Sequence, residues 1–154
     1  MQQIEIDVVK MYPDVILPEY KTDGSAGCDV RAYLREKDFA CDSRVIFHGE
    51  HGIMIPTGLK VKIPSGYYMA VVPRSGIAVK TTMRIANQPG TVDCDYLGEI
   101  KIIVDNNGDD VVINHQDRRA QFIFLPYYQA KFKIVDKLEE TVRGEGGMGS
   151  TGTK

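Results

Sequence analysis

The feature that most restricts the fold of this chain is a period of two in its apolar residues. Apolar and polar side chains alternate in four segments, which are residues 4–8, 28–34, 59–63 and 131–134. Successive side chains of a strand point to opposite faces, so this alternation is typical of half-buried β-strands. Three further segments are more continuously apolar and predict strands covered on both faces, namely residues 67–72, 100–104 and 121–125.

Turn sequences lie between these segments. Pro64-Ser65-Gly66, Gln88-Pro89-Gly90 and Asn106-Asn107-Gly108 each separate two expected strands, as the turn of a β-hairpin does. Helical periodicity is weak, with short candidates at residues 75–81 and 136–141. Many short strands with frequent turns predict an all-β sandwich or barrel.

A shift in composition divides the chain into two unequal parts. The whole chain has 154 residues, the size of one domain, and 43% of them are hydrophobic. Residues 143–154 hold five of the 15 glycines and one large apolar residue, so this segment cannot fold on its own. We expect a β domain over residues 1–142 and a Gly-rich tail over residues 143–154.

Charge and cysteine content exclude several classes of function. The net charge is -2, which argues against direct nucleic-acid binding and against binding to anionic membranes. The longest apolar stretches are far shorter than the ~20 residues of a membrane helix. The three cysteines form no CxxC pair, which argues against a zinc ribbon, and the first residues do not resemble a secretory signal. We therefore expect a soluble cytoplasmic protein with reduced thiols.

Three polar segments carry residues suited to a phosphorylated ligand. Asp29 and the amide of Gln121 could hold a hydrated Mg²⁺ ion, although each is singly more typical of a structural residue. Arg74 precedes Ser75, which could open a short helix whose free N–H groups bind an anion. An ordinary strand end with Ser75 as an N-cap is an equal alternative.

Two other segments offer a base, an aromatic ring and a flexible donor. Asp93 lies in an acidic stretch and could orient a water molecule as general base, and Tyr96 could stack on a sugar or a nucleobase. A solvated acidic loop with a core tyrosine is the alternative. In the tail, Arg143 and the glycines could surround a phosphate, or the tail could simply be disordered.

In their order and spacing, these five segments together resemble the five motifs of the trimeric dUTPases, over essentially the whole chain. The resemblance implies a compact, distorted jelly-roll or β-barrel-like subunit with at most one short helix. It implies Mg²⁺-assisted hydrolysis of dUTP to dUMP and pyrophosphate, which limits uracil in DNA and supplies dUMP for dTMP synthesis. It also implies a homotrimer in which three subunits share each active site and the tail closes over it.

The resemblance implies a role for each matched residue. Asp29 would bind Mg²⁺ through water, and Asp93 would orient the attacking water. Asn87 and the backbone near Gly90 would bind uracil, while Tyr96 would pack on deoxyribose and exclude a 2′-hydroxyl. The remaining residues would contact the phosphates, namely Arg74, Ser75, Gly76 and Gln121, together with Arg143, Gly147, Ser150 and Thr151 of the tail.

Three alternatives to a dUTPase remain open. The first is a dCTP deaminase, or a bifunctional deaminase–dUTPase, on the same fold, which would release ammonia from dCTP. The second is a signalling module that uses the nucleotide as a switch and binds a regulatory protein. The third is an all-β interaction domain without chemistry, against which the five matched motifs argue.

The chain departs from the family pattern at Gln116, where a glycine is usual. If the turn there needs a positive φ, Gln116 is mildly strained. A second departure is Met148, at the position where the family usually places a phenylalanine over the uracil.

Met148 predicts a weakened cover for the uracil ring, because a thioether chain is apolar but less rigid than an aromatic ring. We expect Met148→Phe to lower the KM for dUTP in steady-state hydrolysis, with wild type assayed in parallel. An unchanged or raised KM would contradict this role of residue 148.

Overall fold

Short β-strands form almost all of the regular structure of the chain. The computed structural model describes residues 3–36 and 39–147. Within these residues there are twelve strands and one helix of six residues, which is far too short to span a bilayer. In chain order they are β1 (Asp7–Lys10), β2 (Cys28–Arg31), β3 (Arg35–Glu36), β4 (Phe39–Ala40), β5 (Ser43–Ile46), β6 (Ile53–Lys62), β7 (Tyr67–Pro73), α1 (Ser75–Lys80), β8 (Met83–Ile85), β9 (Gly90–Val92), β10 (Glu99–Asn106), β11 (Val111–Asn114) and β12 (Arg118–Pro126).

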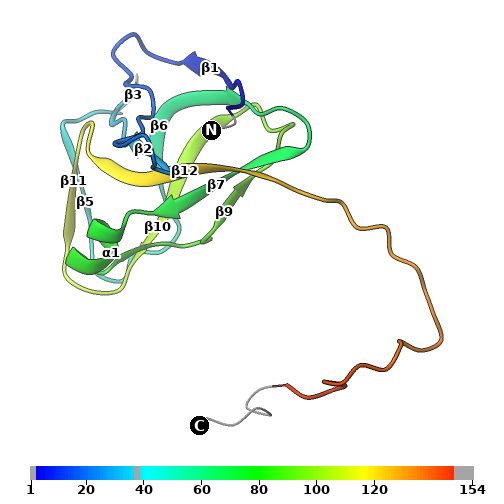
Figure 1. Cartoon of the computed structure of the whole chain (residues 1–154). Helices are drawn as coiled ribbons and strands as arrows, with labels where there is room; N and C mark the ends of the chain where they lie inside the picture. The colour runs from blue at the N-terminus through cyan, green and yellow to red at the C-terminus, as the bar shows by residue number, and fades with distance from the viewer. Residues whose placement is uncertain (1–2, 37–38, 148–154) are drawn as a thin grey trace.

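The strands form two antiparallel four-stranded sheets and two small strand pairs (Figure 1). The larger sheets have the orders β1-β6-β10-β8 and β2-β12-β7-β9, and the pairs are β11-β5 and β3-β4. Helix α1 directly follows β7 and is the only helix in the described part of the chain. The expectation of an all-β subunit with at most one short helix is thus confirmed for these residues.

Apolar side chains of both large sheets meet in one core. On β6, Leu59 and Val61 are buried while Lys60 is exposed, as the alternation predicts. Phe122 of β12 and Met69 of β7 are buried in the other sheet, but the expected cover on both faces is wrong for residues 121–125, where Leu125 is 37% exposed. Hydrophobic burial on this scale is the main source of stability for a domain of this size.

The three expected hairpins are wrong in one respect, because each turn joins strands that lie in different sheets. Residues 64–66 connect β6 to β7, residues 88–90 connect β8 to β9, and residues 106–108 connect β10 to the β11-β5 pair. Turn residues show that the chain changes direction, but not which strand becomes the neighbour. At the turn after β10, the buried Asn106 holds the chain beside β5. Its Nδ2 donates to the carbonyl oxygens of Ile46 (3.0 Å) in β5 and of Asp109 (2.9 Å) in the turn.

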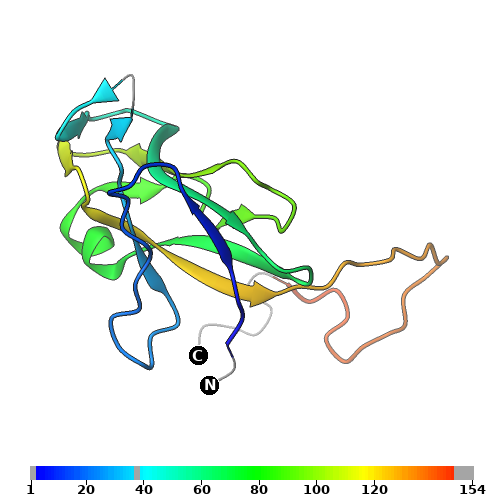
Figure 2. The same ribbon diagram turned by 90° about the horizontal axis from the view of Figure 1, so that it is seen from above.

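The strand expected at residues 131–134 and the helix expected at 136–141 are also wrong. Residues 127–147, which we call the arm, contain no helix or strand among those that the structure describes. The arm leaves the end of β12 and, beyond Tyr127, whose N–H donates to the Gly66 carbonyl (3.1 Å), stands clear of the β core (Figures 1 and 2). Phe132 and Ile134 are 93% and 98% exposed. A single extended segment forms no sheet by itself, because its N–H and C=O groups have no neighbouring strand to bond.

The turn before β12 adopts the strained conformation that the sequence suggested. Gln116 has a φ of 67°, and it is the one non-glycine residue with positive φ among the described residues. Arg31 Nη1 donates to the Gln116 carbonyl (2.9 Å), and Gln116 Nε2 donates to the Asp14 carbonyl (3.2 Å). These contacts hold the turn although its conformation favours glycine.

Replacing Gln116 with glycine should stabilise the protein. A non-glycine residue in this conformation costs about 1–2 kcal/mol, while glycine costs about 0.5–1 kcal/mol in unfolded-state entropy. We expect Gln116→Gly to raise the free energy of unfolding in urea by about 0.5 kcal/mol. The control is Gln129→Gly on the exposed arm, which should give no gain, and a loss of stability in Gln116→Gly would contradict the explanation.

Candidate active site

A buried carboxylate lies where strands β2, β12 and β7 run side by side. Asp29 is only 4% exposed. Arg74 Nε and Gln121 Nε2 donate to its Oδ1 at 2.9 and 3.2 Å, and Arg118 Nη1 donates to its Oδ2 at 3.1 Å. An ionised carboxylate is stable away from water only when it is paired in this way. We call these four residues the Asp29 cluster.

Strand register brings the cluster together. β12 lies between β2 and β7, so that Gln121 is opposite both Asp29 and Val72. Arg74 directly follows β7 and reaches back to the carboxylate. Asp29 was expected on the polar side of a half-buried strand, but β2 is buried on both faces, and the cluster is what makes this possible.

Arg118 is a member of the Asp29 cluster that sequence reasoning missed. Only Gln121 was selected from its strand, β12. A basic residue three positions before a selected amide is a weak signal by itself. The pairing of Arg118 with Arg31, next to a register shift between Arg118 and Ala120, is what places its guanidinium at Asp29.

Helix α1 presents its first turn beside the Asp29 cluster. The helix begins at Ser75, and its N-cap is Arg74, which makes no side-chain capping bond. The alternative that Ser75 is the N-cap is therefore wrong. Ser75 and Gly76 are exposed first-turn residues, and first-turn N–H groups have no acceptor within their own helix. The hydroxyl, the free amides and Arg74 together can bind an anion.

A cavity of about 260 Å³ contains the other group of predicted residues. Asn87, Gly90, Asp93 and Tyr96 all line it, together with apolar residues such as Ile100. A Cβ atom at Gly90 would lie 3.3 Å from Asn87 Nδ2, so a larger residue would displace the amide of Asn87. We call this hollow the Tyr96 cavity.

The loop that carries Asp93 and Tyr96 connects two strands that belong to different sheets. β9 pairs with β7, and β10 pairs with β6 and β8, so that β9 and β10 lie in different sheets. The Tyr96 N–H donates to the Asp93 carbonyl (3.2 Å), and the Tyr96 hydroxyl donates to the Glu99 carbonyl (3.1 Å). These two bonds hold the loop in shape, although β9 and β10 share no ladder of backbone hydrogen bonds.

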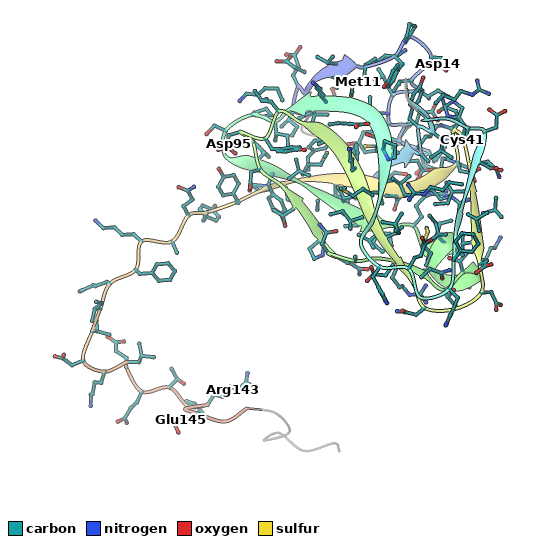
Figure 3. All side chains as sticks on the ribbon, turned by 180° about the vertical axis from the view of Figure 1, so that it is seen from behind. Met11, Asp14, Cys41, Asp95, Arg143 and Glu145 are labelled. Atoms are coloured by element: carbon teal, nitrogen blue, oxygen red, sulfur yellow. The ribbon has the colours of Figure 1, made fainter. Side chains whose placement is uncertain are left out.

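The tail residues do not join either group. Arg143 and Gly147 lie exposed on the arm, and Arg143 Nε donates to the Gly146 carbonyl (2.7 Å). Figure 3 shows Arg143 well away from the body of the domain that carries Asp95. The other tail predictions lie outside the described residues, and they concern Met148, Ser150 and Thr151.

The two groups are also separate from each other. Within the described part of the chain, no member of the Asp29 cluster lines the Tyr96 cavity. One chain therefore presents a nucleoside-sized hollow and a cationic cluster, but not a closed site.

The donor set allows only indirect contact with a metal ion. No group of three His, Cys, Asp or Glu side chains that could hold a metal occurs among residues 3–36 and 39–147. The Asp29 carboxylate already accepts three hydrogen bonds, which leaves one acceptor position on Oδ2. Mg²⁺ keeps several waters and leans on substrate phosphates, so the cluster fits a water-mediated contact with it.

Comparison with known proteins identifies close relatives. The dUTPase family model matches residues 14–152. The deoxyuridine 5′-triphosphate nucleotidohydrolase of Bdellovibrio bacteriovorus is 44% identical and that of Fusobacterium nucleatum is 42% identical, each over 99% of both chains. These relatives give no support to the deaminase alternative.

Solved structures confirm the fold. The dUTPase of Staphylococcus bacteriophage 80alpha with dUPNHPP has a TM-score of 0.84 at 24% identity, covering 97% of this chain and 99% of that one. A mutant dUTPase of the S. aureus phage phi11, described as coordinating a structural Mg(II) ion, has a TM-score of 0.76 at 22% identity and covers 89% of this chain and 100% of that one. The chain therefore has the compact, distorted jelly-roll fold that was expected.

Removing the charge of Asp29 should destabilise the domain, because Arg74 and Arg118 would then face a neutral group. Breaking a buried pair costs roughly 3–5 kcal/mol, and partial exposure of both arginines reduces this. We expect Asp29→Asn to lower the free energy of unfolding in urea by about 2 kcal/mol. The exposed Asp23→Asn is the control, and equal stability of the two variants would contradict the role of the cluster.

Proposed function

The chain belongs to the dUTPase family of dUTP nucleotidohydrolases, and we propose that it converts dUTP to dUMP and pyrophosphate by attack of water on the α-phosphorus. The observation that carries the proposal is the Tyr96 cavity. It brings a free carboxylate, an aromatic ring and an amide to one hollow, through Asp93, Tyr96 and Asn87. These are the residue types that water activation, sugar packing and base binding require.

Asp93 is the proposed general base. It is exposed at the cavity, and its carboxylate accepts no hydrogen bond from the described residues, so a water molecule can approach it. As the water oxygen bonds to the α-phosphorus, its proton passes to the Asp93 carboxylate. The bond from the α-phosphorus to the bridging oxygen breaks, and the electron pair leaves with pyrophosphate.

The Asp29 cluster is the proposed triphosphate site. Arg74 uses Nε for Asp29 and Nη1 for the Arg118 carbonyl (3.3 Å), and its Nη2 has no partner among the described residues. The carboxylate therefore orients the guanidinium and leaves one of its nitrogens for a phosphate. Ser75 and Gly76 add first-turn donors, and Gln121 adds its amide. Donors already in place stabilise developing charge without reorganisation.

Mg²⁺ is the proposed cofactor. When bound, it would neutralise charge on the triphosphate. Asp29 would contact it by accepting a hydrogen bond from a metal-bound water, since direct coordination would compete with Arg74 and Arg118. The phosphates of the substrate would supply the other contacts.

Selection of the nucleoside is assigned to the Tyr96 cavity. Asn87 and the backbone beginning at Gly90 would bind uracil, and the Tyr96 ring would exclude a 2′-hydroxyl. A buried polar mismatch can discriminate by ~10⁴-fold or more, so the cavity would reject cytosine through its hydrogen bonds. The activity would limit uracil in DNA and supply dUMP in the cytoplasm.

The active form is proposed to be a homotrimer with shared sites. Two observations support this, namely that the cavity and the cluster of one chain do not meet, and that the arm carries Arg143 away from both. A neighbouring subunit would cover Phe132 and Ile134, which are almost fully exposed in one chain. The tail from residue 143, including Gly147, Met148, Ser150 and Thr151, would close over the triphosphate of a neighbour and exclude water.

Hydrolysis with Mg²⁺ of dUTP, dTTP, dCTP and UTP, with products resolved, tests the proposal. We expect selective conversion of dUTP to dUMP and pyrophosphate. Asp93→Asn should lower kcat by about 10²–10⁴-fold while dUTP binding persists. Asp95→Asn, in the same loop but outside the cavity lining, is the matched control and should keep its activity.

Several outcomes would contradict this function. Release of orthophosphate would exclude attack at the α-phosphorus, and turnover of all four nucleotides would exclude a selective cavity. Ammonia from dCTP would point to a deaminase, and an active Asp93→Asn protein would exclude the proposed base.

A further inference from the structure

We propose that Gly98 is a positioning residue that sets the discrimination between dUTP and UTP, because it leaves the space in which the Tyr96 ring lies. The inference rests on the proposed function, in which this ring excludes the 2′-hydroxyl. Gly98 does not line the Tyr96 cavity, so its effect would pass through Tyr96.

The ring of Tyr96 lies directly against Gly98. A Cβ atom at residue 98 would be 2.4 Å from Tyr96 Oη, 2.6 Å from Cζ and 3.0 Å from Cε2. Real Cβ atoms essentially never approach another heavy atom closer than 3.0 Å. Any side chain at residue 98 would therefore displace the ring.

The ring, and not the backbone, is what requires glycine here. Gly98 does not belong to the described glycines with positive φ, so its backbone conformation would accept an L-amino acid. The clashing atoms belong to the end of a side chain that can rotate. Alanine at residue 98 should thus move the Tyr96 ring and leave the fold intact.

A second contact gives the ring a defined place. The Tyr96 hydroxyl donates to the Glu99 carbonyl (3.1 Å), and Glu99 Oε1 in turn accepts the Gly58 N–H (2.9 Å) from β6. The Glu99 side chain is only 10% exposed. The acceptor of the hydroxyl is therefore tied to the sheet, and the ring is held between Gly98 and the Glu99 carbonyl at the wall of the cavity.

The test compares Gly98→Ala with Gly24→Ala. A Cβ atom at Gly24 would meet no other atom within 4 Å, and Gly24 has no positive φ, so it undergoes the same chemical change without a clash. For Gly98→Ala we expect the ratio of kcat/KM for dUTP to that for UTP to fall about tenfold or more. The ratio of kcat/KM for dUTP to that for dTTP should stay within about twofold, since the change removes none of the proposed base contacts at Asn87 and Gly90. Gly24→Ala should change neither ratio.

A double-mutant cycle separates positioning from general damage. In a Tyr96→Ala background, Gly98→Ala should have no further effect on the dUTP/UTP ratio, because the ring that it displaces is gone. The melting temperature of the double variant should not lie below that of Tyr96→Ala, since no clash remains. Tyr96→Phe keeps Gly98 and loses only the hydrogen bond to the Glu99 carbonyl, and it should also lower the dUTP/UTP ratio. This variant tests the inference if Gly98→Ala does not fold.

Failure of the inference is distinct from failure of the proposed function. A wild-type protein without preference for dUTP over UTP would refute the function itself. A wild-type preference that persists in Gly98→Ala, or in Tyr96→Phe, would refute only the role of the ring position. An equal fall in the ratio with and without the Tyr96 ring would show that residue 98 acts by another route.

Discussion

A carboxylate that is nearly removed from water must be neutralised by its neighbours, and Asp29 meets this requirement with donors from two other segments of the chain. Arg74 comes from the end of β7, while Arg118 and Gln121 come from β12. The same contacts that stabilise the charge orient two guanidinium groups at the start of α1. Structural stability and the proposed anion binding would therefore depend on one set of hydrogen bonds, so a change that weakens one should weaken the other.

The candidate site residues of one chain form two separate groups. The Asp29 cluster lies where β2, β12 and β7 meet, whereas the Tyr96 cavity is lined by β9, by the loop that follows it and by residues of β6, β7 and β10. In the proposed trimer, each part would be completed by a neighbour, and the arm would bring the last phosphate contacts. Dividing a site in this way would make catalysis depend on assembly, since no single chain holds all of its groups together.

Glycines next to functional side chains follow a common physical pattern in this domain. Gly27 lies against Gln121, Gly90 against Asn87 and Gly98 against Tyr96, and in each case a Cβ atom would crowd the functional group. Each of these glycines provides space rather than an unusual backbone angle. The shape of the proposed site is thus determined partly by glycines such as Gly27 and Gly98, to which no ligand contact is assigned and which a search for polar and charged residues cannot find.

Much about this protein follows from its sequence alone. The period of two predicted strands such as β2 and β6, since side chains alternate across any strand, and five polar segments in order indicated the family and most of the candidate residues. Gln116 showed that even one backbone conformation was predictable from a departure from the family pattern. The sequence did not determine which strands are neighbours, because turn residues specify only a reversal of the chain. Strand pairing in the tertiary structure placed Arg118 at Asp29 and made each of the three turns connect two different sheets. It also left residues 131–134 without a neighbouring strand. These outcomes depend on contacts between residues far apart in the chain, and local patterns carry no information about them.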